Sequence, residues 1–256
     1  MLPAPSEYAA FAHHLADEAR AITLAHFRRP MHTQWKSDAS PVTQADKETE
    51  AHLRTLIAAR YPEHAILGEE FGANASRSPW QWIIDPIDGT RSFMSGHPLF
   101  ATLIALYHQD TPVINLIDMP ALNERFVATR DTATTCNDTP AHTRQLPLNE
   151  ALLYSSDPGM FTAAQYARRE RLASQCALSR YGGDAYLYAM LACGWIDIVI
   201  EADMKTHDFM PLVLIVEQAG GIISDWQGKP LGLHSNGEIL ACANRELHRE
   251  ALAALH

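Results

Sequence analysis

The amino-acid sequence predicts an α+β or layered α/β fold, in which helices alternate with long strands. Apolar residues recur at helical spacing in several segments, whereas residues 101–128 form three successive strand patterns joined by short turns, which is typical of antiparallel sheet. The chain has 256 residues, of which 47% are hydrophobic and 20% charged. That size and composition allow one large domain, or two lobes around a shared cleft.

The first third of the chain is expected to begin with two helices. Tyr8, Phe11 and Leu15 fall on one helical face, and Pro30 follows as a stop signal. A strand pattern comes later, where an apolar run ends in acidic residues. The expected elements are a helix over 7–28, a turn over 37–41, a helix over 43–60, a strand over 65–67, a polar loop over 73–79 and a strand over 82–84.

The remaining two thirds mix strands and helices. Gly220 and Gly221 follow an apolar helical pattern and indicate a left-handed cap that ends it. The expected elements are strands over 101–107, 113–118 and 124–128, a strand or loop region over 131–149, helices over 162–174 and 184–193 with a strand over 177–180 between them, a strand over 195–201, a helix over 209–219, strands over 222–225 and near 239, and a helix from 245.

Composition argues against several classes of protein. The formal net charge is −10, whereas broad nucleic-acid binding needs a basic surface. The four cysteines lie far apart without a CxxC pair, which predicts reduced thiols in a cytoplasmic protein. No apolar run approaches the roughly 20 residues of a membrane span, and residues 1–7 lack the basic start of a signal peptide. We therefore expect no nucleic acid and no membrane among the partners.

Two carboxylates stand three positions apart where an apolar run ends. The stretch reads Trp82-Ile83-Ile84-Asp85-Pro86-Ile87-Asp88-Gly89-Thr90. The proline favours an extended Asp85, and Gly89 permits a tight turn, so Asp88 can turn back toward Asp85 with the Ile87 carbonyl between them. Three oxygens from one short loop suit magnesium, and the backbone amides of Gly89 and Thr90 could face a phosphate.

Two further acids occupy comparable positions. Glu69 follows an apolar strand and a glycine, and Asp208 precedes an apolar helix. Each has an ordinary alternative, Glu69 as a solvated loop acid and Asp208 as a helix N-cap, and the residues alone leave both readings open. Gathering four carboxylates is repulsive, since one pair at ~4 Å costs about 4 kcal/mol at an effective dielectric of about 20. Divalent cations remove that penalty.

Three motifs in combination resemble the inositol monophosphatase superfamily. They are Gly68-Glu69-Glu70, then Asp85-Pro86-Ile87-Asp88-Gly89-Thr90-Arg91-Ser92-Phe93, then an aspartate before a helix that ends Glu217-Gln218-Ala219-Gly220-Gly221. The resemblance covers nearly the whole chain. It implies a layered α-β-α-β-α sandwich, magnesium-dependent phosphatase activity and a homodimer. It also implies a single phosphatase unit of two lobes, a metal-binding lobe over about 1–140 and a substrate lobe over about 141–256.

The resemblance also implies a set of metal ligands. Glu69, Asp85 and the Ile87 carbonyl would hold one Mg²⁺, and Asp85, Asp88 and Asp208 would hold a second. A third, weaker ion would lie near Glu69. These ions would clamp the phosphate and lower the pKa of a water.

The catalytic residues implied by the resemblance are Asp46, Thr90 and Glu69. Asp46 lies in Pro41-Val42-Thr43-Gln44-Ala45-Asp46, which matches the family's segment around its water-orienting aspartate. Asp46 and Thr90 would orient and deprotonate a water that attacks phosphorus in line. Lys36, in the loop before Asp46, could approach the site from above.

Within the superfamily, three segments resemble the histidinol-phosphate phosphatase branch. They are residues 92–103, residues 181–186 and residues 205–209. His207 stands where the inositol branch usually carries tryptophan, which weakens an inositol reading. Histidinol phosphate carries an amine and an imidazole, so Asp184 or Glu201 is expected to pair with the ammonium, each with a structural alternative as a helix cap or a solvated strand-end acid.

On the phosphate side of the substrate, the expected binding residues are Asp88, Gly89 and Thr90. The first hypothesis is therefore a histidinol-phosphate phosphatase, which converts L-histidinol phosphate and water into L-histidinol and phosphate in histidine biosynthesis. The second is an inositol-1-monophosphatase or a broad sugar-phosphate phosphatase. The third is a regulatory binding protein on the same fold that contacts RNA or the transcription machinery.

Overall fold

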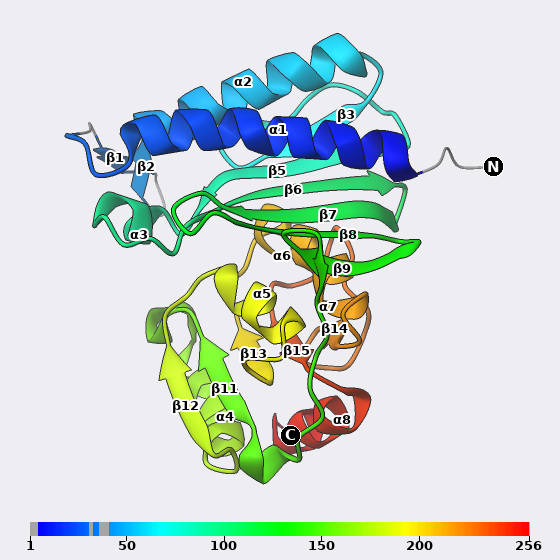
Figure 1. Cartoon of the computed structure of the whole chain (residues 1–256). Helices are drawn as coiled ribbons and strands as arrows, with labels where there is room; N and C mark the ends of the chain where they lie inside the picture. The colour runs from blue at the N-terminus through cyan, green and yellow to red at the C-terminus, as the bar shows by residue number, and fades with distance from the viewer. Residues whose placement is uncertain (1–4, 31–32, 36–40, 256) are drawn as a thin grey trace.

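Five layers of secondary structure stack in the computed structural model of the chain, which describes residues 5–30, 33–35 and 41–255 (Figure 1). Two long helices cover one face of an eight-stranded sheet, and short helices separate that sheet from a five-stranded one. Two more helices lie on the far side of the second sheet. The predicted α+β class, with its α-β-α-β-α order, is confirmed.

The first sheet has the strand order β10-β9-β8-β7-β6-β5-β3-β4. Every neighbouring pair in it is antiparallel except β3 and β5. Its strands are β3 (Ala65–Gly68), β4 (Gly72–Ala73), β5 (Trp80–Asp88), β6 (Ala101–His108), β7 (Thr111–Met119), β8 (Glu124–Thr129), β9 (Thr132–Cys136) and β10 (Thr139–Pro140).

Helices α1 (Pro5–His26) and α2 (Gln44–Arg60) lie along the outer face of this sheet. Leu15 of α1 and Leu53 of α2 are fully buried in one cluster with Trp82 of β5. Both helices were predicted, and α1 lies two residues ahead of its expected bounds. A small antiparallel pair, β1 (Thr33–Trp35) and β2 (Pro41–Thr43), leads directly into α2. Residues 36–40, with Lys36 and most of the expected turn, lie outside the described residues.

The second sheet has the order β12-β11-β13-β15-β14. Strand β11 is parallel to both of its neighbours, whereas β15 is antiparallel to β13 and β14. The strands are β11 (Leu152–Ser155), β12 (Leu178–Tyr181), β13 (Ile198–Glu201), β14 (Ile222–Ser224) and β15 (Ile239–Cys242).

The helices around the second sheet form the middle and outer layers. Between the sheets lie α5 (Tyr186–Ala192), α6 (Thr206–Phe209), the 3-10 turn η3 (Met210–Leu212) and α7 (Val213–Glu217). On the far side lie α4 (Ala163–Ala173) and α8 (Arg245–Leu255). Shorter elements are α3 (Thr90–Met94), η1 (Leu148–Glu150) and η2 (Pro158–Met160).

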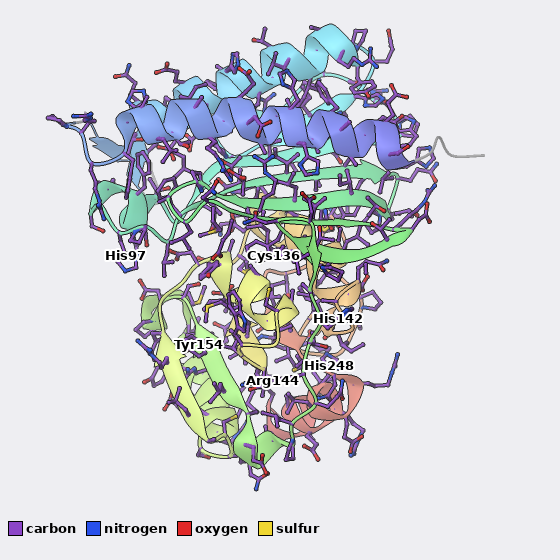
Figure 2. All side chains as sticks on the ribbon, in the orientation of Figure 1. His97, Cys136, His142, Arg144, Tyr154 and His248 are labelled. Atoms are coloured by element: carbon purple, nitrogen blue, oxygen red, sulfur yellow. The ribbon has the colours of Figure 1, made fainter. Side chains whose placement is uncertain are left out.

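A single connection of extended chain leads from the first sheet to the second, and it is fastened by an ion pair. Arg144, labelled on this connection in Figure 2, donates to both oxygens of the buried Asp197 at 2.7 and 2.6 Å. Asp197 also accepts from the backbone N–H of Leu152 at 2.8 Å, where β11 begins. The contact therefore ties the connection to the start of two strands of the second sheet.

Some elements differ from the sequence-based expectations. Strand β5 runs on through both acids instead of ending at Ile84, and β11 was not predicted. The expected helix over 209–219 starts at Thr206 and is divided into α6, η3 and α7 around Pro211. Gly220 has φ 99°, as predicted for the cap. All four cysteines carry free thiols, and no helix in the described part of the chain has the length and apolarity to cross a bilayer.

Candidate active site

The end of β5 turns both predicted acids to the same side of the sheet. Residues three apart on a regular strand face opposite sides. Asp85 pairs with Leu103 of β6 but Asp88 pairs with Ala101, so one extra residue sits between them as a bulge. The backbone N–H of Ile87 donates to Asp85 Oδ1 at 3.0 Å. A proline within this bulge disturbs no ladder, because the pairing is already interrupted there.

Asp208 reaches this pair from the middle layer. It was expected at the N-cap of its helix, but α6 begins earlier, with Lys205 as the N-cap, so Asp208 is the third helical residue. There it accepts from the backbone N–H of Lys205 at 2.7 Å. One carboxylate oxygen each from Asp85, Asp88 and Asp208 lie within 4.8 Å of one another. The structure therefore brings Asp208 together with two acids that lie 120 or more residues before it in the sequence.

Glu69 joins a second acidic group to the first. It lies in the turn between β3 and β4, and one oxygen each from Asp46, Glu69 and Glu70 lie within 4.8 Å of one another. The charge of Glu69 and a side-chain hydrogen bond with it also help to raise the pKa of Asp85, after burial as the main cause. All four acids expected as metal ligands thus belong to one continuous cluster.

Asp46 uses one carboxylate oxygen for its own helix. Its Oδ2 accepts from the backbone N–H of Thr43 at 2.8 Å and from the Thr43 hydroxyl, which caps α2. Its Oδ1 is buried and has no hydrogen-bond partner among the described residues, and the same holds for the Thr49 hydroxyl one turn later. Because an unpartnered buried carboxylate oxygen is costly, this oxygen is suited to accept from a group bound at the site.

The turn after Asp88 packs against the second sheet's side of the site. Gly89 has φ 77°, and a Cβ there would lie 2.8 Å from Asp184 Oδ2, so a side chain would be both strained and obstructed. Thr90 begins α3, and its hydroxyl donates to the Ile87 carbonyl at 3.2 Å. The carbonyl expected as a metal ligand is therefore within hydrogen-bond reach of the hydroxyl expected to orient water.

A pocket of about 160 Å³ opens beside the cluster. Its lining comes from the ends of β5 and β13, the segments that follow β11 and β13, the two residues before α5, and α6, and it contains five acids. The lining residues are Asp88, Ser156, Met160, Asp184, Ala185, Glu201, Ala202, Asp203, Met204 and Asp208. Both acids expected to read the leaving group, Asp184 and Glu201, are among them.

Asp184 and Glu201 are held in different ways. Asp184 has φ 46° and lies two residues before α5 rather than at its N-cap, and the Ser92 hydroxyl donates to its Oδ2 at 3.0 Å. Glu201 ends β13 as predicted and is buried, not solvated. Its Oε2 accepts from the Tyr188 hydroxyl at 2.7 Å, and its Oε1 accepts from the Ser156 backbone N–H at 3.1 Å and from the Ser156 hydroxyl.

The acids are forced into a low-dielectric environment. Burial is the main cause that raises the pKa of Asp85, Asp88 and Asp208, and the negative charge of neighbouring carboxylates raises it further. Among the neighbouring carboxylates, Asp184 has the largest effect on the pKa of Asp88. At Asp184 burial again raises the pKa, while the nearby charge of His97, labelled beyond α3 in Figure 2, works in the opposite direction.

The donor set fits hard divalent cations. It consists of carboxylates and one backbone carbonyl, which are the oxygen ligands that Mg²⁺ prefers. The crowding of negative charge and the unpartnered Asp46 Oδ1 both require a positive partner or a donor. The residues therefore suit an implied magnesium centre on chemical grounds.

Glu201 gives a prediction on pH and stability. Burial raises its pKa from 4.5 to about 7, against the opposing effect of its hydrogen bonds. Because the folded-state pKa is the higher one, its contribution to stability is present below the unfolded-state pKa and is lost as the pH rises through about 7. Between about pH 5 and about pH 8, we expect the free energy of unfolding of the metal-free protein to fall by about 2.5 kcal/mol more in the wild type than in Glu201→Gln.

Urea unfolding of both metal-free proteins at the two pH values measures this difference. The Glu201→Gln protein is the internal control, because every other buried acid is the same in both chains. Equal falls in the two proteins would contradict the raised pKa of this carboxyl.

Two contributors to the site were not assigned from the sequence. Glu70 completes the second acidic group, and its position next to Glu69 in the motif was the available signal. Tyr188 is fully buried on α5, and its hydroxyl orients Glu201. That role depends on a partner 13 residues away, which helical periodicity does not reveal.

Known proteins resemble this chain over its whole length. A model of the inositol monophosphatase family matches residues 4–256. The chain is 36% identical to the chloroplastic bifunctional phosphatase IMPL2 of Arabidopsis thaliana, over 97% of this chain and 75% of that protein. It is 33% identical to the histidinol-phosphatase of Chlorobaculum parvum, over 94% of this chain and 93% of that one. The solved structure of an inositol monophosphatase from Zymomonas mobilis matches with a TM-score of 0.91 at 38% identity, covering 99% of each chain.

Proposed function

The chain belongs to the inositol monophosphatase family, and from that premise we propose that its substrate is L-histidinol phosphate, which it hydrolyses to L-histidinol and phosphate in histidine biosynthesis. Membership makes it a metal-dependent phosphatase that acts on a small phosphomonoester. The proposal concerns the identity of the alcohol that leaves, the ions, and the residues that perform each step.

The observation that carries the choice of substrate is the charge of the pocket. Five of its ten lining residues are acids, and the other five are uncharged. With Asp88 and Asp208 assigned to the metal cluster, three acids remain for the leaving group: Asp184, Glu201 and Asp203. The histidinol amine is a cation at neutral pH and its imidazole is partly so, which means that such a wall attracts this alcohol more strongly than an uncharged polyol.

The metal ligands proposed are Glu69, Asp85, Asp88, Asp208 and the Ile87 carbonyl, for two Mg²⁺ with a third, weaker ion near Glu69. When bound, these ions supply positive charge to the phosphate oxygens and to the leaving oxygen. The acids of the chain determine where the ions bind. The segments that carry these acids, namely the β5 bulge, the β3–β4 turn and the start of α6, are each stabilised by their own hydrogen bonds.

Asp46 and Thr90 are the proposed groups that orient the attacking water. Asp46 Oδ1 is free to accept a proton, and burial raises the pKa of this carboxyl, which makes it a better base than an exposed aspartate. The Thr90 hydroxyl donates to the Ile87 carbonyl, which supports its proposed place beside that ligand. Gly89 is the N-cap of the short helix α3 and Thr90 is its first residue, which supports the proposal that their backbone amides bind phosphate oxygens.

An inositol-1-monophosphatase, or a broader sugar-phosphate phosphatase, is the second candidate. The observation in its favour is the 38% identity to the inositol monophosphatase of Zymomonas mobilis. Two observations stand against it. The pocket is acidic, and His207 occupies the position at which the inositol branch usually carries tryptophan. The Nε2 atom of His207 lies 3.2 Å from Asp208 Oδ1.

A regulatory RNA- or transcription-associated binding protein is the third candidate, and in its favour the Nus factor SuhB of Pasteurella multocida is 33% identical over 85% of this chain and 84% of that protein. The intact set of clustered acids argues for an enzyme instead.

Substrate preference tests the proposal. With Mg²⁺ present, we expect kcat/KM for L-histidinol phosphate to exceed that for inositol 1-phosphate by about tenfold or more, which corresponds to about 1.4 kcal/mol. Glu201→Gln keeps the shape of the side chain but removes its charge, so it should reduce most of this preference and leave the inositol rate nearly unchanged. Faster turnover of inositol 1-phosphate by the wild type would overturn the choice of substrate.

The assembly and the location of the protein are also proposed. We propose a cytoplasmic homodimer, on the resemblance to the family, and light scattering of the purified protein measures the oligomeric state directly. Growth of a histidine auxotroph that lacks its own phosphatase, after introduction of this gene, would support the role in histidine biosynthesis.

A further inference from the structure

We propose that Glu50 is a positioning residue, whose buried carboxylate holds the turn between β3 and β4 in the conformation that presents Glu69 to the metal cluster. This inference rests on the proposed role of Glu69 as a metal ligand. Glu50 lies on α2, one turn after Asp46, and it is fully buried although it is charged.

The turn carries its acids at the tip of a very short hairpin. Gly68 of β3 pairs with Gly72 of β4, so three residues, Glu69, Glu70 and Phe71, form the connection. Glu50 Oε2 accepts from the backbone N–H of Glu70 at 2.6 Å, and Glu50 Oε1 accepts from the backbone N–H of Phe71 at 3.1 Å. Both contacts come from outside the hairpin, and they fix the two residues that follow Glu69.

Arg54 completes the clamp from the next turn of α2. Its Nε donates to Glu50 Oε1 at 2.7 Å, and its Nη2 donates to the Gly72 carbonyl. The guanidinium also lies 5.9 Å from the centre of the Phe71 ring. Glu50 and Arg54 therefore both bind the backbone of the turn through charge-assisted hydrogen bonds, which are stronger than neutral ones.

Gly68 leaves the space that this carboxylate occupies. A Cβ on Gly68 would lie 2.1 Å from Glu50 Oε1 and 2.4 Å from its carboxyl carbon. No side chain fits there unless Glu50 moves away. The glycine of the Gly68-Glu69-Glu70 motif thus serves the approach of Glu50, in addition to any role in the turn itself.

Repulsion explains why the turn needs a clamp. A carboxylate oxygen of Glu69 lies within 4.8 Å of one oxygen each from Asp46 and Glu70, and the charge of Glu69 also acts on Asp85. Without metal, like charges push this tip outward, and two free backbone N–H groups would let it move. A glutamine at position 50 offers one acceptor oxygen instead of two, and turns an N–H₂ group toward a backbone donor.

Metal binding measured without substrate tests the proposal. We expect Glu50→Gln to weaken Mn²⁺ binding by about tenfold or more, because Glu69 is no longer held in place. Electron paramagnetic resonance measures this binding when Mn²⁺ is added to the metal-free protein. The rate at saturating Mg²⁺ should fall far less than the affinity. The matched control is Glu48→Gln on the same helix, whose exposed carboxylate pairs with His26; it should bind Mn²⁺ like the wild type.

Gly68→Ala is the second variant, and it should weaken Mn²⁺ binding in the wild-type background. It should have little further effect on Glu50→Ala, in which no carboxylate obstructs the new Cβ.

Amide hydrogen exchange of the metal-free wild type adds a test that needs no variant. The Glu70 and Phe71 amides should exchange slowly in the wild type and faster in Glu50→Gln.

Unchanged Mn²⁺ affinity in Glu50→Gln, or rapid exchange of these two amides in the wild type, would overturn the proposal. Both readouts are made without a substrate. A wrong choice of substrate would therefore leave these results unaffected, and the two failures can be told apart.

Discussion

Replacement of Asp85 by asparagine is expected to lower kcat/KM by a factor of about 1,000 or more. Asp85 is the residue shared by both proposed metal positions, and it lies buried between Glu69 and the Asp88–Asp208 pair. Asparagine keeps an oxygen for the backbone N–H of Ile87, so the bulge should survive. Steady-state kinetics over a range of Mg²⁺ concentrations measures the loss.

The same substitution should stabilise the protein when metal is absent. Removal of one buried charge relieves the repulsion that raises the pKa of its neighbours, so we expect a higher melting temperature than the wild type at about pH 8 without metal. The control is Asp110→Asn in the exposed β6–β7 turn, which should change neither quantity. An Asp85→Asn protein that keeps even a tenth of the wild-type turnover would exclude a shared ligand at this position.

Removal of divalent metal is expected to abolish turnover and to lower the melting temperature of the wild type. The buried carboxylates ionise at neutral pH only against burial and mutual repulsion, and bound cations offset both. At a Mg²⁺ concentration about 100 times its Kd, binding adds about 2.7 kcal/mol to the free energy of unfolding. For a chain of this length that corresponds to a rise of roughly 5–10 °C.

Calorimetry of chelator-treated protein, before and after Mg²⁺ is restored, measures the rise, and phosphate release measures recovery of activity. Asp85→Asn should show a much smaller rise, which separates binding at this cluster from a general effect of salt. Full hydrolysis by metal-free protein, or an equal rise in both proteins, would show that the cluster is not the metal centre.

The parts of the site that the sequence predicted are those whose chemistry is local. Asp85, Asp88 and Gly89 lie within five residues, and the apolar run before them with the proline between them already indicates a strand end and a turn. The inclusion of Asp208 among the metal ligands was predicted only through the motif, and its expected position at the N-cap of its helix was wrong. Its helix starts at Thr206 because Lys205 is still extended, and the division at Pro211 hides the true start from a periodicity argument.

The parts that were missed depend on contacts between distant segments. Glu50 looks like an ordinary polar residue of an amphipathic helix, yet it is buried because a turn about 20 residues later folds onto it. Strand β11 is only four residues long, and although its burial alternates, its sequence Leu-Leu-Tyr-Ser shows no alternation of polar and apolar side chains that would mark it. Tertiary packing decides both features, and a single sequence does not carry it.

The two sheets contribute different chemistry to one site. The bulge of β5 and the β3–β4 turn supply most of the proposed phosphate-handling acids, whereas the segment before α5, the end of β13 and the loop after it supply the acids proposed to face the departing alcohol. Relatives of this protein could therefore diverge in substrate by changing the second set alone, while the hydrolytic machinery stayed intact. Engineering a new specificity on this scaffold should accordingly begin with residues 156, 184 and 201–204, and spare the first sheet.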